Sequence, residues 1–233
     1  MIDEYDRRNQ INCYSSRYYE HGYSKLTLGW NKGKQDVRFD NLVSDFASEI
    51  ASASCIDLGC GFGDFLPFWK ACGGEGYIGV DIVPELINEA KKRFGDIGDS
   101  LFIEADFLDE DFEHEADFIV ASGPFNYKFV HTSNYDFIEQ CLRKSFSLCR
   151  IAASFNFLSD KVDWKNDHAW YSSPAMILDM AFALSRNVIL RNNYMPFEFN
   201  LTIFKDDSFE ASDTLFTRYK KTLIEEDRRI PYE

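Results

Sequence analysis

The sequence predicts a doubly wound α/β fold in which five parallel strands are followed by an antiparallel hairpin. Three observations indicate this fold. Short apolar runs alternate with amphipathic helical segments five times along the chain. A glycine-rich loop joins the first strand to the helix after it. Two last apolar runs, 188–191 and 197–204, lie so close together that they must pair antiparallel, because a parallel return needs a crossover of roughly a dozen residues.

Length and composition are typical of one globular domain. The chain has 233 residues, of which 45% are hydrophobic and 27% charged, enough for a sizeable core. No apolar run approaches the roughly 20 residues of a transmembrane helix. Residues 1–6 lack the basic and apolar regions of a signal peptide. We therefore expect a cytoplasmic location and no membrane partner.

The charge balance argues against nucleic acid as a partner. The chain has 25 Lys and Arg residues and 39 Asp and Glu residues, so its net charge is −14. This negative charge repels phosphate backbones. The densest basic cluster, 91–93, closes a predicted helix, where cations favour the helix dipole. The six cysteines show no C-x-x-C pair and no metal-ligand spacing, so we expect reduced thiols and no metal.

The first strand and its loop make up the most informative stretch. Apolar residues at helical spacing predict a helix over 34–52, followed by a strand at 54–58 and a helix at 63–71. Between them the loop has the pattern G-x-G-x-G, which lets a ligand lie against bare main chain. Asp64 stands where the dinucleotide fingerprint has its third glycine, which disfavours a dinucleotide oxidoreductase. Asp57 adds a second negative charge, so a cationic ligand without phosphates fits, as S-adenosylmethionine would.

The next two strands place acidic residues at the same edge of the sheet. Asp81 ends a strand at 77–81 and lies 20 residues beyond Gly61, the spacing at which an acid accepts hydrogen bonds from ribose hydroxyls. Ile82 follows it and could pack on an adenine. A helix at 84–94 leads to a third strand, 101–107, that ends in an acid and an aromatic residue.

The run Asp57-Leu58-Gly59-Cys60-Gly61-Phe62-Gly63 resembles motif I of the class I S-adenosylmethionine-dependent methyltransferases. The resemblance covers about residues 14–205. Its matching stretches include Gly29-Trp30 and the last strand. It points to a little-characterised bacterial group, some of whose members sit with surface-glycan genes. It implies a Rossmann-like sheet, S-adenosylmethionine as cofactor, and an N-terminal helical cap. The tyrosines of residues 1–31 would either close over the cofactor or only pack that segment onto the domain.

The resemblance also implies a set of cofactor-binding residues. Asp106 would accept from the adenine amino group, and Phe107 would donate its backbone N–H to the ring. Arg38 could pair with the cofactor's carboxylate, although a solvated surface arginine is an equal alternative. The full expected set is Arg38, Asp57, Gly59, Cys60, Gly61, Asp81, Ile82, Asp106, Phe107 and Ser122.

The acceptor is expected at the loops that follow the fourth strand, 116–122, and the fifth strand, 151–158. After the fourth strand, Ser122-Gly123-Pro124-Phe125 is one residue away from the [D/N/S]-P-P-[Y/F/W] motif with which some methyltransferases grip an amino group. Its Gly in place of Pro weakens that prediction. The expected substrate-binding residues are Asn126, Tyr127, Trp164 and Tyr171.

His168, in the polar and aromatic loop 159–171, is the candidate catalytic base. An ordinary loop histidine is the alternative reading of it, and His131 is the second candidate.

The sequence thus predicts a methyltransferase that methylates an oxygen or nitrogen of a small molecule, such as a sugar or surface-glycan precursor. The alternative is a non-catalytic regulatory protein that binds S-adenosylmethionine or S-adenosylhomocysteine. We expect a cap at 1–33, the methyltransferase domain at 34–205, and a tail at 206–233. The terminal segments could form a homodimer interface.

Overall fold

The computed structural model describes residues 2–29, 34–212 and 214–225. Two of the features discussed above lie outside the described residues: Trp30, which carries part of the resemblance, and the end of the tail, 226–233.

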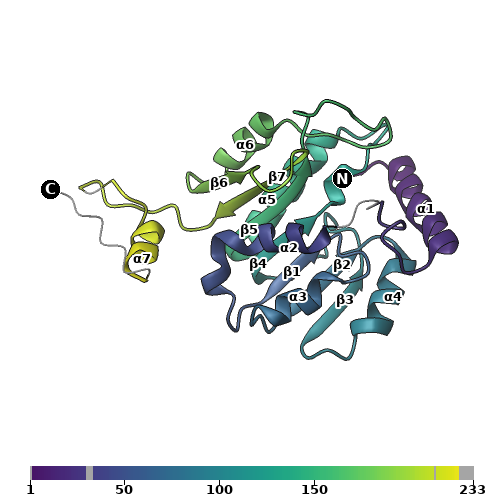
Figure 1. Ribbon diagram of the computed structural model, residues 1–233, viewed down its shortest axis with the longest axis horizontal. Helices are drawn as coiled ribbons and strands as arrows, with labels where there is room; N and C mark the ends of the chain where they lie inside the picture. The colour runs from purple at the N-terminus through teal and green to yellow at the C-terminus, as the bar shows by residue number, and fades with distance from the viewer. Residues whose placement is uncertain (1, 30–33, 213, 226–233) are drawn as a thin grey trace.

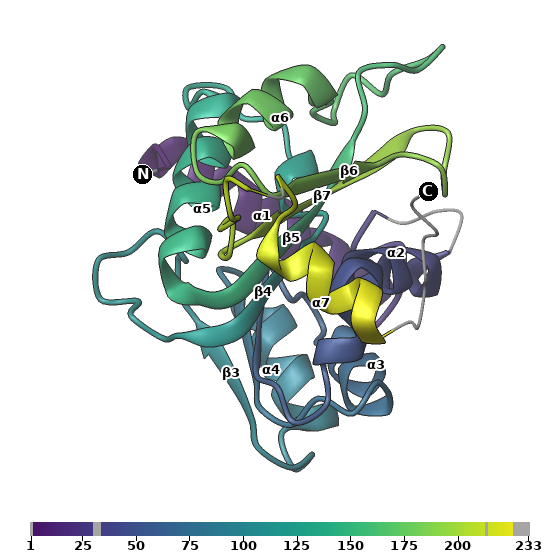
Figure 2. The ribbon, with the colours of Figure 1, turned by 90° about the vertical axis from the view of Figure 1, so that its left-hand side faces the viewer.

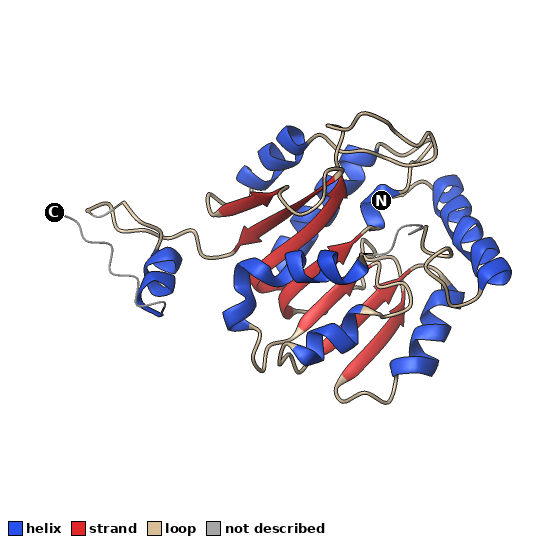
Figure 3. Cartoon of the chain, in the orientation of Figure 1, coloured by secondary structure: helices blue, strands red, loops and turns tan. Residues whose placement is uncertain are grey.

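A seven-stranded sheet forms the centre of the molecule (Figure 3), in the order β3-β2-β1-β4-β5-β7-β6. Strands β1 to β5 run parallel, β7 is antiparallel to β5, and β6 is antiparallel to β7. This confirms the predicted five parallel strands with a C-terminal hairpin. The strands are β1 Cys55–Leu58, β2 Tyr77–Asp81, β3 Ser100–Glu104, β4 Ala116–Ser122, β5 Cys149–Leu158, β6 Val188–Arg191 and β7 Glu198–Phe204.

Helices cover both faces of the sheet (Figures 1 and 2), as a doubly wound fold requires. The helices α2, α3 and α4 pack on one face around Trp69 and Phe118, and α5 and α6 pack on the other around Ile138 and Phe155. These helices are α2 Gln35–Val43, α3 Phe65–Ala71, α4 Pro84–Phe94, α5 Asn134–Leu148 and α6 Pro174–Phe182.

The expectation of one continuous helix over 34–52 is wrong. Helix α2 ends at Val43, and the 3₁₀-helix η1, Ser44–Glu49, follows with a kink at Phe46, whose φ is −141°. The Phe46 ring stacks on Phe118 of β4, with 4.2 Å between centroids and 12° between planes. Because this ring is only 1% exposed, packing against the sheet outweighs the local helical preference.

The N-terminal segment is the predicted helical cap. Helix α1, Glu4–His21, lies beside α4 (Figure 1), where Ser15 and Tyr19 donate hydrogen bonds to Glu85. Its other end is held by Asp6, whose carboxylate accepts the backbone N–H groups of 130–132 at 2.6–2.8 Å. Burial raises the pKa of Asp6, but these three donors outweigh it, so the pKa lies below its usual value.

The tail forms one helix in its described part, α7 Thr217–Glu225. Arg218 attaches it to the domain: its guanidinium pairs with Glu49 and lies 3.9 Å from the ring centroid of Phe204. Among the described residues, no helix combines the length and the apolar character needed to cross a membrane. The predicted role of the terminal segments in a homodimer stays a prediction.

Candidate active site

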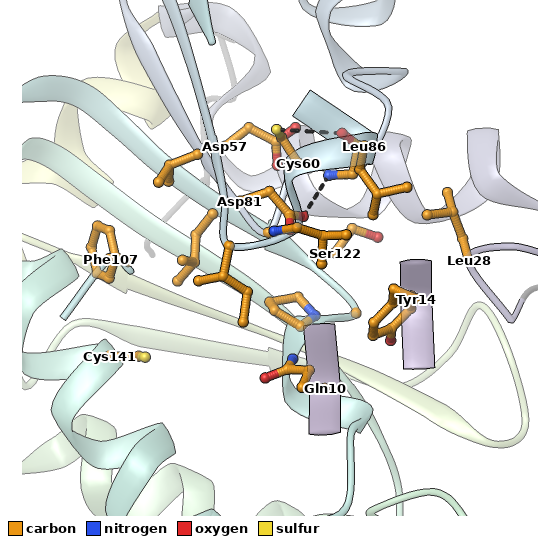
Figure 4. Close-up of a pocket in the computed structure, with 18 of the residues that line it drawn as sticks. Gln10, Tyr14, Leu28, Asp57, Cys60, Asp81, Leu86, Phe107, Ser122 and Cys141 are labelled. Atoms are coloured by element: carbon orange, nitrogen blue, oxygen red, sulfur yellow. Dashed lines mark hydrogen bonds between the residues drawn. The ribbon is translucent and has the colours of Figure 1, made fainter. Parts of the chain in front are cut away.

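A first cavity opens where β1, β2, β3 and β4 end (Figure 4), at the carboxyl edge of the sheet. Nine of the ten residues predicted to bind the cofactor line it, and Arg38 does not. The nine are Asp57, Gly59, Cys60, Gly61, Asp81, Ile82, Asp106, Phe107 and Ser122. The structure therefore brings together residues from four strand ends, although their binding role stays a prediction.

Two glycines of the loop occupy positions that no larger residue fits. Gly59 has φ +68°, and a Cβ there would lie 2.7 Å from Cβ of Pro124. Gly63 has φ +75°, and a Cβ would lie 2.6 Å from a ring carbon of Phe102. Both the backbone conformation and the close neighbours require glycine. The loop consequently stays close against β4 and exposes main chain to the cavity.

Asp81 is held rigidly at the end of β2. Its carboxylate accepts the N–H of Gly61 and the N–H of Val83, both at 2.9 Å. Each oxygen keeps a lone pair for a further donor, because a carboxylate offers about four acceptor sites. Burial raises the pKa of Asp81, while the backbone donors oppose this shift. The residue can accept two ligand hydroxyls without moving.

Asp57 is a buried carboxyl beside the same loop, only 4% exposed. Burial raises its pKa to about 7, the Tyr77 hydroxyl that donates to it at 2.7 Å lowers it, and the charges of Asp81 and Asp64 raise it further. Asp57 therefore changes charge near neutral pH. A cationic ligand in the cavity would favour its ionised form.

Asp64, which the sequence placed at the start of the helix after the loop, does not line this cavity. It stands at the N-cap position of α3, accepts the Tyr23 hydroxyl at 2.6 Å, and receives a longer bond of 3.4 Å from the Gln35 amide. Its role in the structure is to join the glycine loop to the N-terminal segment.

Asp106 has a partner that sequence reasoning missed. One of its oxygens accepts the Leu108 N–H at 2.9 Å, and the other pairs with Arg7 of α1. The pair lies 99 residues apart in sequence, so no local pattern predicts it. Arg7 neutralises the carboxylate at the predicted adenine position.

Helix α1 contributes two more residues to the first cavity (Figure 4), Gln10 and Tyr14. Gln10 is 8% exposed, and its side-chain oxygen has no hydrogen-bond partner among the described residues. Burial raises the pKa of Tyr14 to about 12, so its hydroxyl keeps its proton. The tyrosine-rich composition of the first 31 residues was the only sequence signal for this helix; Gln10 had none.

A second cavity of about 820 Å³ lies between the loops after β4 and β5. The two loops are joined by the bridge between Tyr127 and Ala169 and by the Trp170 N–H, which donates to the Asn126 carbonyl at 2.9 Å. The Asn126 side chain also accepts the Leu158 N–H at 3.2 Å. All five residues predicted for the acceptor side line this cavity: Asn126, Tyr127, Trp164, His168 and Tyr171.

Gly123 explains the departure from the amino-group motif. Its φ is +95°, a value that proline cannot adopt because its ring fixes φ near −65°. The turn after β4 therefore needs glycine where the motif has proline.

Arg38 lines the second cavity and is bound to a carboxylate of the protein. It is an almost fully buried arginine, and its Nε lies 2.8 Å from Oε2 of Glu198, the first residue of β7. The Asn156 amide donates to the same oxygen at 3.1 Å. The predicted contact of Arg38 with the cofactor's carboxylate stays a prediction.

The two cavities meet at three residues that line both: Tyr14, Leu28 and Gly123. A ligand in the first cavity and a ligand in the second can therefore approach each other along the turn that follows β4.

The first cavity suits a cationic nucleoside. Three carboxyl side chains line it, Asp57, Asp81 and the Arg7-paired Asp106, and no lysine or arginine does so among the described residues. Bare glycine backbone and the unpartnered amide oxygen of Gln10 supply space and a polar contact. A ligand with ammonium and sulfonium groups and no phosphate fits this set. In the described part of the chain, no group of three His, Cys, Asp or Glu residues is placed to hold a metal ion.

Comparison with known proteins shows that the chain is similar to methyltransferases. The family model "Methyltransferase domain" matches residues 55–148. The "Putative methyltransferase Rv1506c" of Mycobacterium tuberculosis is 34% identical over 155 residues, which cover 64% of this chain and 91% of that protein.

Solved structures share the fold of this chain. The magnesium protoporphyrin IX methyltransferase ChlM from Synechocystis PCC 6803, with bound S-adenosylmethionine, superposes with a TM-score of 0.62 at 14% identity, covering 88% of this chain and 98% of that one. The complex of DhpI with S-adenosylhomocysteine gives 0.63 at 15% identity, covering 86% and 97%.

Proposed function

This chain belongs to the class I S-adenosylmethionine-dependent methyltransferases, and we propose that it methylates an oxygen or nitrogen of a sugar or surface-glycan precursor. Its cofactor is S-adenosylmethionine, and its acceptor is a small molecule. The observation that carries the proposal is the junction of the two cavities at Tyr14, Leu28 and Gly123. A nucleoside cavity alone would serve binding, whereas a second cavity that shares three lining residues with it provides room for an acceptor.

The cofactor residues have distinct proposed roles. Asp81 accepts the ribose hydroxyls, since both its oxygens are already oriented by backbone donors. Gly59 and Gly61 let the methionine part lie against main chain, and Asp57 provides negative charge beside it. When bound, S-adenosylmethionine supplies a methyl group activated by its sulfonium. The protein then contributes alignment and exclusion of water.

On the acceptor side, the aromatic rings of Tyr127 and Tyr171 hold the acceptor against the turn at Gly123. A sugar hydroxyl needs a base to take its proton as the new bond to carbon forms. We assign this role to an imidazole nitrogen of His168, which lines the cavity from an exposed position in the loop after β5. The Tyr14 hydroxyl remains protonated and can donate a hydrogen bond at the junction.

Two further expectations belong to this proposal. The net charge of −14 argues that the acceptor is not a nucleic acid. A cytoplasmic location remains a prediction. The regulatory alternative is less favoured, because a protein that only senses the nucleoside has no need of a second cavity.

Methyl transfer tests the proposal directly. We expect purified protein to transfer labelled methyl from S-adenosylmethionine to a component of a bacterial small-molecule extract or to a sugar panel. His168→Ala should lower kcat by about 100-fold, in the range of general-base effects, with S-adenosylhomocysteine affinity unchanged. Turnover near wild type would remove His168 from the mechanism, and binding without any methylated product would favour the regulatory function.

The pH dependence of cofactor binding tests the role of Asp57. Its pKa of about 7 means that raising the pH from 6 to 8 ionises it, and the ionised form attracts a cationic ligand. S-adenosylmethionine affinity should therefore rise by roughly tenfold over this range, with less change for S-adenosylhomocysteine, which lacks the sulfonium. Calorimetry at several pH values measures the affinity for each of the two ligands. Asp57→Asn should abolish the dependence, and an identical pH profile in that variant would contradict the assignment.

A further inference from the structure

The two cavities carry opposite charge, although the whole chain is acidic. The first is lined by three carboxyl side chains, of which Asp106 is paired with Arg7 of α1, and by no lysine or arginine among the described residues. The second is lined by four cationic side chains and two acidic ones, Asp167 and Glu198. Since the net charge of the chain is −14, a cationic surplus at this one place is not a consequence of composition.

Ion pairing within the protein does not remove this surplus. Arg38 and Glu198 neutralise each other in the floor of the second cavity. The other three cations, Arg17, Lys34 and Lys128, form no ion pair with any residue that the structure describes. The cavity therefore keeps three positive side chains against one exposed carboxylate.

These three cations come from separate segments that surround the cavity. Arg17 extends from α1, with its guanidinium 5.4 Å from the ring centroid of Tyr14 at the junction. Lys34 precedes α2. Lys128 follows β4, and its Nζ donates to the Asp167 carbonyl at 3.1 Å, which fixes it across the two acceptor loops.

We propose that the acceptor carries an anionic group, a phosphate ester or a carboxylate, bound by Arg17 and Lys128 with support from Lys34. This inference rests on the proposed function and specifies its substrate class. Arginine and lysine bind both anions through charge-assisted hydrogen bonds, which are about twice as strong as neutral ones. The acidic body of the protein repels anions, so a local cationic cavity is needed to attract one.

The anionic group and the reacting atom occupy different ends of the acceptor. Tyr14 and Gly123 lie at the junction, where the methyl group arrives, while Lys128 and the loop after β5 lie on the acceptor side. The rings of Tyr127, Tyr171 and Trp164 lie along the second cavity and can cover an apolar or sugar face between the two ends.

Calorimetry with small probes tests this inference in the presence of saturating S-adenosylhomocysteine. The probes are glucose 1-phosphate, glucuronate, inorganic phosphate and neutral glucose. We expect at least one anionic sugar to bind ten or more times tighter than glucose. Whichever of glucose 1-phosphate and glucuronate binds more tightly identifies phosphate or carboxylate as the bound group. The affinity should fall with increasing salt.

Arg17→Gln and Lys128→Gln should each weaken the anionic probe about tenfold, while Arg17→Lys keeps most of the affinity because it keeps the charge. The matched control is Arg143→Gln, an exposed arginine of α5 paired with Glu139, which should change nothing. Equal binding of all probes, or unchanged binding in both variants, would overturn the inference.

Affinity for S-adenosylhomocysteine is measured separately in every variant. If it falls in Arg17→Gln and Lys128→Gln, these cations serve the cofactor's own carboxylate and the inference fails. Failure of wild-type protein to bind the nucleoside would instead contradict the proposed function, and the anionic probes can then still be titrated alone.

Discussion

Asp81→Asn should weaken binding of S-adenosylhomocysteine by about 100-fold or more. The substitution removes the negative charge from an oxygen pair that two backbone N–H groups hold in place at 2.9 Å. Hydrogen bonds to a charged group contribute about 1.5–3 kcal/mol each, so losing the charge from two ribose contacts accounts for this factor. Isothermal titration calorimetry measures the change.

Asp64→Asn is the matched control for this prediction. Asp64 lies in the same loop, but its carboxylate binds Tyr23 and it does not line the first cavity. Its substitution should alter the affinity by less than about threefold, because it removes no ligand contact. Equal losses in the two variants would show that loop stability, and not a ribose contact, determines binding.

Glu198→Ala should lower the free energy of unfolding by about 3–5 kcal/mol, since it leaves the buried Arg38 without its neutralising carboxylate. Both side chains are at most 6% exposed, so water would replace the lost partner only in part. Urea denaturation measures the change, and the melting temperature should fall by roughly 10 °C.

Two comparison variants test whether the uncompensated charge of Arg38 causes the loss of stability. Glu139→Ala breaks an exposed pair with Arg143 and should cost less than about 1 kcal/mol. The double variant Arg38→Met with Glu198→Leu should recover most of the stability, because replacing both ions by apolar groups removes the uncompensated charge. A loss below 1 kcal/mol in Glu198→Ala would contradict the role assigned to this pair.

Local sequence patterns predicted the parts of this structure that depend on local chemistry. The five parallel strands follow from apolar runs, and the positive φ of Gly59 and Gly63 follows from the glycine spacing. Asp81 could be located because the acid at the end of the second strand has a fixed distance from the loop. These residues lie within one strand–helix–strand unit, where sequence distance determines spatial distance.

The remaining features depend on contacts between distant segments. The kink at Phe46 arises from stacking on Phe118, and the partner of Arg38 lies 160 residues away at Glu198. The position of α1 follows from separate polar contacts with α4, with the loop after β4 and with Asp106. Sequence spacing gives no information about these long-range contacts, so Gln10 and Arg7 were not predicted near the site.

The opposite charge of the two cavities also required the structure. Arg17, Lys34 and Lys128 are widely separated in sequence, and each reads as an ordinary surface cation. Only the packing of α1 and of the loop after β4 brings them to the same cavity. The cationic lining from which we propose an anionic acceptor is therefore a property of the fold.

The central claim is that the first cavity binds the nucleoside of the methyl donor against the glycine loop. Titration of wild-type protein with S-adenosylhomocysteine tests it most directly, because this product needs no knowledge of the acceptor. We expect one binding site per chain with a micromolar Kd, and loss of that binding in Asp81→Asn. Absence of binding by the wild-type protein would contradict the account.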